Sequence, residues 1–171
     1  LGKRAMHRVA RLPHHGAMTA APSSPPRIVL DTNVCLDLFL FRDPSCARLL
    51  AALQAGAVQA VTRDDCREEW LRVLHYPQLP IDAARRPALR AAYDALLHGM
   101  ADAVAPLDAP LPLCRDPDDQ KFLQLACAAR ASWLLSKDKE LLRLDRRTRR
   151  AGLFAILLPQ DWWPPPAASV G

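Results

Sequence analysis

The sequence lacks an uninterrupted run of about 18 apolar residues, the length that a helix needs to cross a membrane. It also lacks an apolar segment of about 7 to 15 residues after its basic beginning, which a secretory signal would require. These absences predict a soluble, cytoplasmic protein without membrane contact. In composition, the Arg-rich and acid-free beginning also resembles a transit peptide, and the sequence leaves that alternative open.

Paired metal-binding cysteines are absent as well. The five cysteines form no CxxC pair, and no histidine is spaced as a zinc partner. Each cysteine lies in or beside an apolar run, where a free thiol commonly serves as a small core residue. The sequence therefore predicts reduced, structural cysteines at positions Cys35, Cys46, Cys66, Cys114 and Cys127.

The excess of positive charge lies in the first 26 residues. The formal net charge is +5, but residues 1–26 contain four basic residues and no acid, which leaves 19 basic and 18 acidic residues beyond them. Charge balance alone therefore does not indicate nucleic-acid binding. We predict a basic leader without stable structure over 1–26, one domain over 27–163 and a Pro-rich tail over 164–171.

Short apolar runs alternate with segments of helical character between residues 27 and 158. Strands are expected at 27–30, 57–62, 132–136 and 153–158, with a weaker one at 103–105. Helices are expected just beyond Asn33 and over 46–55, 62–74, 82–101, 116–129 and 137–150, with Thr62 as a cap and Pro87 splitting one segment into a helical pair. This alternation predicts an α/β fold with three layers, a mostly parallel sheet between helices.

Acidic residues follow two of the expected strands. Ligands of parallel sheets bind beyond the carboxyl ends of the strands, where Asp31 and Asp138 are expected. Two carboxylates about 4 Å apart repel each other by roughly 4 kcal/mol at an effective dielectric constant near 20, so a gathering of acids favours a divalent cation. Hard cations such as Mg²⁺ take oxygen ligands.

Helical geometry distinguishes the neighbouring acids of the segment 62–74. Glu69 falls close to the apolar stripe that contains Cys66 and Trp70, whereas Glu68 points to the opposite side, where it is expected to pair with Arg72. A carboxylate beside an apolar stripe is costly, so Glu69 is the candidate for a functional role.

The third acidic cluster is harder to interpret. Asp116 precedes Pro117 and is expected to cap a helix. Asp118 and Asp119 both fall near the apolar stripe of that helix, and the residues alone do not decide between them.

Four segments resemble the motifs of PIN-domain nucleases and occur in the order of that family. They are 28–33 with Asp31-Thr32-Asn33, 69–74, 116–123 with Asp116-Pro117-Asp118-Asp119, and 136–142, followed by a similar closing segment at 158–162. The resemblance covers residues 27–163 and implies a PIN-like fold that cleaves RNA with one or two Mg²⁺ or Mn²⁺ ions. Many small bacterial members are toxins that a cognate antitoxin protein neutralises, and small members often form homodimers.

Carried over by position, the resemblance implies a set of metal-binding and catalytic acids, in which Asp119 is chosen because it directly precedes Gln120. The set is Asp31, Glu69, Asp119 and Asp138. Supporting roles around these acids fall to Thr32, Asn33, Asp116 and Ser136. Because an anionic substrate must reach an acidic site, nearby basic residues are candidates for RNA binding, although those of 137–150 also fit a solvated helix end. They are Lys121, Lys137, Lys139, Arg143, Arg146 and Arg147.

The resulting hypothesis is a metal-dependent endoribonuclease that acts as the toxin of a type II toxin–antitoxin pair. One alternative is a catalytically silent module that binds RNA or a partner on the same fold. Another is a phosphatase of the haloacid dehalogenase type, which usually has a second Asp two residues after the first, where Asn33 stands.

Overall fold

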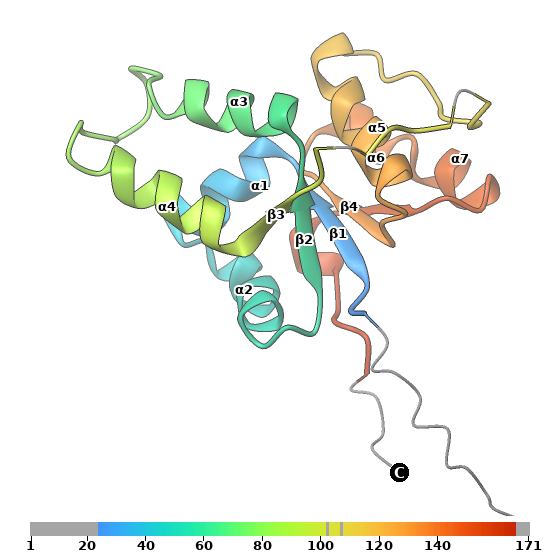
Figure 1. The fold of residues 1–171 in the computed structure, drawn as a ribbon, viewed down its shortest axis with the longest axis horizontal. Helices are drawn as coiled ribbons and strands as arrows, with labels where there is room; N and C mark the ends of the chain where they lie inside the picture. Colours follow the sequence, from blue (N-terminus) through green and yellow to red (C-terminus); the bar gives the residue numbers. More distant parts are fainter. Residues whose placement is uncertain (1–23, 102, 107, 167–171) are drawn as a thin grey trace, which may run out of the picture.

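A parallel sheet lies at the centre of the fold in the computed structural model, which describes residues 24–101, 103–106 and 108–166 (Figure 1). Its five strands are all parallel and follow the order β3-β2-β1-β4-β5. They are β1 (Arg27–Leu30), β2 (Gln59–Thr62), β3 (Leu97–Gly99), β4 (Trp133–Leu135) and β5 (Ala155–Leu157). The predicted α/β class is confirmed, whereas most of the predicted leader and the end of the predicted tail lie outside the described residues.

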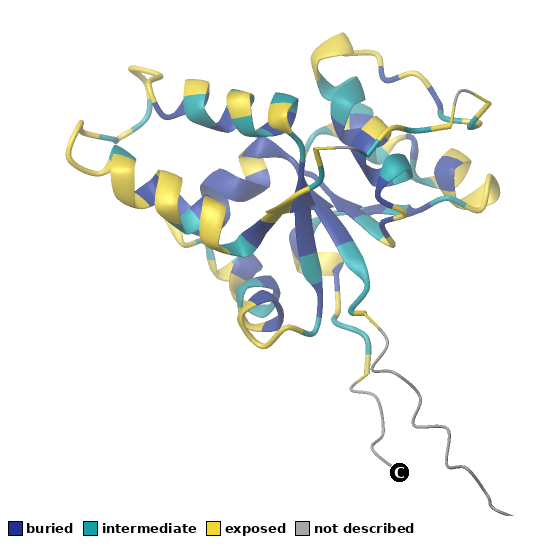
Figure 2. Ribbon diagram, in the orientation of Figure 1, coloured by how far each residue is buried: buried dark blue, intermediate teal, exposed yellow. Residues whose placement is uncertain are grey.

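Alternating side chains of β1 belong to two separate hydrophobic cores, one on each face of the sheet. Ile28 and Leu30 belong to one core and Val29 to the other, and all three are buried. Both faces are therefore covered by helices, and Figure 2 shows β1 and β2 largely buried between them and the edge strand β3 largely exposed. The first core packs against α1 (Thr32–Leu36), a π-helical turn (Asp37–Phe41), α2 (Ala47–Gln54), α3 (Asp64–Val73) and α4 (Arg86–Leu96). The second packs against α5 (Gln120–Ala128), α6 (Lys139–Leu142) and α7 (Asp145–Arg150).

The strand order places a topological switch point beside β1. The chain passes from β1 to β2 and β3 on one side, and then crosses to β4 and β5 on the other. The ends of β1 and β4 are joined directly, because the backbone N–H of Asp31 donates to the carbonyl of Leu135 at 3.1 Å. Ligands of such sheets bind at this point, beyond the carboxyl ends of the strands.

The edge strand β3 corrects two predictions. The helix expected over 82–101 ends at Leu96, and the strand expected at 103–105 is not formed. Leu97 adopts extended backbone and pairs with Ala60 of β2, so β3 lies at 97–99. Its signal in the sequence is weak because only Leu97 of its three residues is buried.

Pro87 does not produce the predicted helical pair. It stands in the first turn of α4, where a proline needs no N–H partner and has a favourable φ, so it begins one helix instead of splitting two. The predicted cap at Thr62 is also wrong, since α3 begins at Asp64 with Arg63 in the cap position. The Thr62 hydroxyl instead shares a buried hydrogen bond of 2.6 Å with Tyr93.

The helix predicted over 137–150 is two helices, α6 and α7. Leu141 and Leu144 both belong to the second core, and the carboxylate of Asp145, at the start of α7, accepts the backbone N–H of Ile156 at 2.7 Å. All five cysteines are free; Cys35, Cys46, Cys66 and Cys114 are buried as predicted, whereas Cys127 is half-buried. In the described ranges, no helix combines the length and the apolar character that crossing a membrane requires.

Candidate metal and nuclease site

Asp31 lies buried directly beyond β1 and caps α1. Its Oδ1 accepts the backbone N–H of Val34 at 2.8 Å, and its Oδ2 accepts the hydroxyl of Ser136, which is fully buried beyond β4. The Ser136 hydroxyl oxygen in turn accepts the backbone N–H of Asp138 at 2.9 Å. A continuous chain of hydrogen bonds thus links Asp31 and Asp138 across the switch point.

Asp138 and Asp119 each stand at the start of a helix, Asp138 before α6 and Asp119 before α5. Asp138 caps α6 by accepting the backbone N–H of Glu140 at 2.7 Å. Asp119 stands immediately before α5, is half-buried and lies near the carboxyl group of Asp138, which raises the pKa of Asp119. Asp118 is exposed, so the burial and contacts of Asp119 separate two acids that the helical pattern left undecided.

Burial and nearby carboxylates destabilise the charged forms of Asp31 and Asp119. Burial raises the pKa of Asp31 to about 6, against the hydrogen bonds from Ser136 and Val34, and the charges of Asp138 and Glu69 add to the rise. Burial, the contact with Asp138 and nearby carboxylates raise the pKa of Asp119 to about 7. Carboxylates in this condition favour either a proton or a cation.

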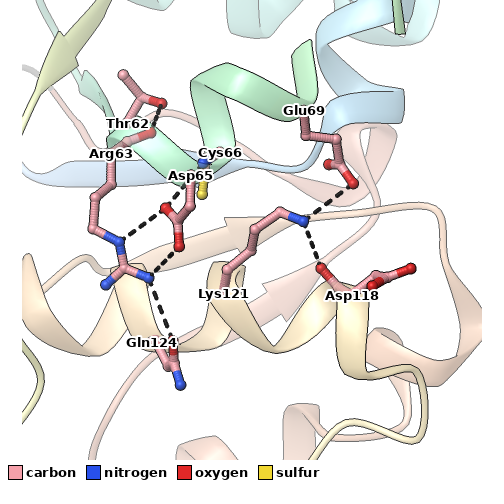
Figure 3. A network of polar contacts seen from close by, with 8 residues as sticks. All are labelled: Thr62, Arg63, Asp65, Cys66, Glu69, Asp118, Lys121 and Gln124. Atoms are coloured by element: carbon pink, nitrogen blue, oxygen red, sulfur yellow. Dashed lines mark hydrogen bonds and ion pairs between the residues drawn. The ribbon is translucent and has the colours of Figure 1, made fainter. Parts of the chain in front are cut away.

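Glu69 reaches the site from the other layer. Its side chain on α3 is half-buried, and one carboxylate oxygen accepts the hydroxyl of Thr32. The other oxygen pairs with the Lys121 ammonium at 3.2 Å (Figure 3). Glu68 is exposed, so the predicted division between the two acids is confirmed. The predicted ion pair of Glu68 with Arg72 is not formed, although both residues are described.

The four acids do not form a ready-made cage. Across the described ranges, no group of three or more Asp, Glu, His or Cys side chains is arranged as a metal site. The donor set nevertheless fits a hard divalent cation, because it consists of carboxylate oxygens, and the charged forms of Asp31 and Asp119 are disfavoured without a cation. Ser136 links Asp31 to Asp138, burial and the charges of these two acids raise the pKa of Asp119, and Thr32 and Lys121 hold Glu69.

A family model for the PIN domain matches residues 27–140, about two thirds of the chain. The chain belongs to the PIN domain family. PIN domains are generally nucleases that act on nucleic acid with divalent metal ions. No curated protein matches this chain.

The remaining supporting residues occupy unequal positions in this PIN domain. Thr32 and Ser136 contact the acids directly, as described above. Asp116 is exposed and caps the short turn before α5, since its Oδ1 accepts the backbone N–H of Asp118 at 3.0 Å. Asn33 is exposed, and no side-chain hydrogen bond engages it within the described ranges.

Lys137 has a partner that the sequence analysis missed. Its ammonium lies 2.5 Å from the carboxylate of Asp37, a buried acid in the π-helical turn, and this contact raises the pKa of Lys137. The missed signal is an acid inside the apolar run after β1, the same kind of intrusion that singled out Glu69. The ion pair of Lys137 therefore links the turn between β4 and α6 to the π-helical turn of the PIN domain.

The other basic candidates do not all face the acids. Lys139 is exposed beside Asp138, and Arg143 pairs with Glu140 at 3.1 Å. Arg146 and Arg147 are exposed on α7, which leads back toward the start of β5. Because β5 is parallel to β4, its start lies at the amino ends of the strands, whereas Asp31 and Asp138 follow the carboxyl ends.

An apolar hollow lies apart from the acidic site of this PIN domain. It has a volume of about 430 Å³ between the π-helical turn, α2 and α4, and none of the four acids lines it. Its walls include Leu38, Phe39, Leu50, Ala92 and Leu96.

Proposed function

We propose that this PIN domain is a Mg²⁺- or Mn²⁺-dependent endoribonuclease and the toxin of a type II toxin–antitoxin pair. The observation that supports the nuclease proposal is the link from Asp31 through Ser136 to Asp138 at the switch point, together with the raised pKa of Asp31 and of Asp119, which burial and nearby carboxylates cause. Each acid comes from a different element, so only the fold brings their charges together.

In this proposal, one or two ions are held by Asp31, Asp119 and Asp138, with Glu69 completing the set. When bound, the metal lowers the pKa of a coordinated water and neutralises charge on the phosphate. Ser136 and the Val34 N–H fix the Asp31 carboxylate, and Thr32 fixes that of Glu69. These protein donors orient the acids in advance, so that little reorganisation is needed for phosphodiester hydrolysis.

The test is RNA cleavage by the purified full chain with Mg²⁺ or Mn²⁺, measured against an EDTA control. Asp31→Asn should abolish cleavage without unfolding the protein, because asparagine also caps helices and can accept the Val34 N–H. Glu69→Gln should reduce cleavage strongly, and Glu68→Gln is its matched control because Glu68 points to solvent. Cleavage by Asp31→Asn at the wild-type rate would refute the proposal.

The same assay distinguishes a nuclease from the alternative, a catalytically silent module that binds RNA or a partner. Intact RNA after incubation with Mn²⁺, together with retained RNA binding in a gel shift, would indicate a binding module instead of a nuclease. The phosphatase alternative receives no support from the family assignment, and the exposed Asn33 stands where its second acid is expected.

The toxin part of the proposal rests on the resemblance to small bacterial PIN-domain toxins. It predicts a small antitoxin protein encoded beside this gene and growth arrest on expression of the nuclease alone. Co-purification of the product of the neighbouring gene, followed by loss of cleavage in the complex, would support it. Light scattering after size exclusion would show whether the free protein is the homodimer that the resemblance also implies.

A further inference from the structure

We propose that Lys121 is a built-in counter-cation of the site, which holds Glu69 in the metal-free protein and competes with the divalent ion for it. This inference rests on the proposed metal dependence and deepens it. Lys121 then acts as a positioning residue that the metal must displace, in addition to any contact that it makes with RNA.

The first support is the geometry of the ammonium. Its Nζ lies 3.2 Å from Oε1 of Glu69 and 2.7 Å from the carbonyl oxygen of Asp118, between α3 and α5 (Figure 3). The side chains of Lys121 and Glu69 are only 18% and 19% exposed, so solvent screens this ion pair less than a surface pair.

The second support is the distribution of positive charge. Within the described residues, no Lys, Arg or His forms an ion pair with Asp31, Asp119 or Asp138. Of the four acids, only Glu69 therefore has a basic partner among the described residues, and that partner is Lys121.

The third support is the difference between the partners of two acids. Asp31 is fixed by a backbone N–H and a hydroxyl, which are neutral and can stay in place when a cation binds. Glu69 has the Thr32 hydroxyl on one oxygen and a full positive charge on the other. A divalent ion at a Mg²⁺ ligand distance of about 2 Å from that oxygen would repel the ammonium. Metal binding at this oxygen of Glu69 therefore requires the Lys121 ammonium to release it.

The release of Lys121 gives the displacement a functional consequence. The carbonyl of Asp118 can still hold the ammonium at the start of α5 after Glu69 is lost as a partner. The freed charge then lies next to the acids, where a phosphate of the substrate would enter. Metal loading and the availability of this charge for RNA are thereby coupled.

The experiment is calorimetric titration of the metal-free full chain with Mn²⁺. Lys121→Met should bind Mn²⁺ on the order of 3- to 10-fold more tightly than the wild type, because the competing charge is gone. Lys139→Met is the matched control, since it removes the same charge from an exposed position beside Asp138. Its affinity should change less than about twofold in 0.15 M salt, where exposed charges are screened.

A double-mutant cycle localises the effect. In a Glu69→Gln background, Lys121→Met should no longer increase the affinity, because the competition concerns that carboxylate. Circular dichroism checks folding, and Lys121→Gln replaces Lys121→Met if the methionine variant does not fold. Wild-type binding without a gain in the Lys121 variants, or an equal gain in Lys139→Met, overturns the inference alone. Failure of every variant to bind Mn²⁺ overturns the proposed function as well.

Discussion

The burial of Asp31 predicts that the isosteric substitution Asp31→Asn stabilises the metal-free protein. Burial raises the pKa of this carboxyl from 3.8 to about 6. A shift of about two pKa units corresponds to roughly 3 kcal/mol of folding free energy lost at pH 7. Asparagine avoids that cost and can still accept the Val34 N–H, but it replaces the acceptor of the Ser136 hydroxyl at a cost of about 1 kcal/mol.

The net gain is therefore about 2 kcal/mol at pH 7, or roughly 4 to 8 °C in Tm for a chain of this length. The folded-state pKa of Asp31 lies above the unfolded-state value, so the folded protein binds this proton more tightly than the unfolded chain does. The destabilisation of the wild type is complete above about pH 6 and absent below about pH 4. The advantage of Asp31→Asn should disappear over the same window.

The assay is urea unfolding of both proteins in EDTA, followed by circular dichroism at intervals between pH 4 and pH 7. Addition of Mn²⁺ should stabilise the wild type and leave Asp31→Asn nearly unchanged, which connects the instability of Asp31 with its proposed role. A variant that is less stable than the wild type at pH 7 without metal would refute the reasoning. The same conclusion would follow if both proteins showed the same pH dependence.

Three further predictions concern the site and its supports. Mn²⁺ binding at pH 6 should release on the order of one proton, measured by calorimetry in buffers of different ionisation enthalpy, because the pKa of Asp119 is about 7 and a metal requires the charged form. Lys137→Met should lower the free energy of unfolding by roughly 1–3 kcal/mol in urea, since it leaves the buried Asp37 without its partner. Asp145→Ala should cost a similar amount in the same measurement, because the Ile156 N–H loses its acceptor.

Each of these predictions has a control. Equal heats in all buffers would contradict the release of a proton. Lys139→Met removes an exposed lysine and should change stability by less than about 0.5 kcal/mol, so a loss as large as that of Lys137→Met would argue against the pair with Asp37. Glu140→Ala removes an acid whose ion pair is with the exposed Arg143 and should cost less than about 1 kcal/mol.

The sequence pattern predicted a residue's position correctly where its surroundings depend only on the strand or helix that contains it. The apolar run before Asp31 predicts β1, and the helical spacing of α3 separates Glu69 from Glu68. Pattern failed at β3, because an edge strand with one buried residue has almost no signal of its own. It also failed for Lys137, whose partner Asp37 lies 100 positions away in the sequence.

The sequence by itself determined the α/β class and the strand endings that carry acids, because these depend on periodicity and on neighbouring residues. The four motifs were identified by their resemblance to those of PIN-domain nucleases. Only the tertiary structure decided which acids meet. It places Asp119 near Asp138, lets the Ser136 hydroxyl donate to Asp31, and pairs the Lys121 ammonium with Glu69. These contacts come from strand order and helix packing, which bring together residues far apart in the chain. Burial, repulsion and the competition for a cation arise only once that packing exists.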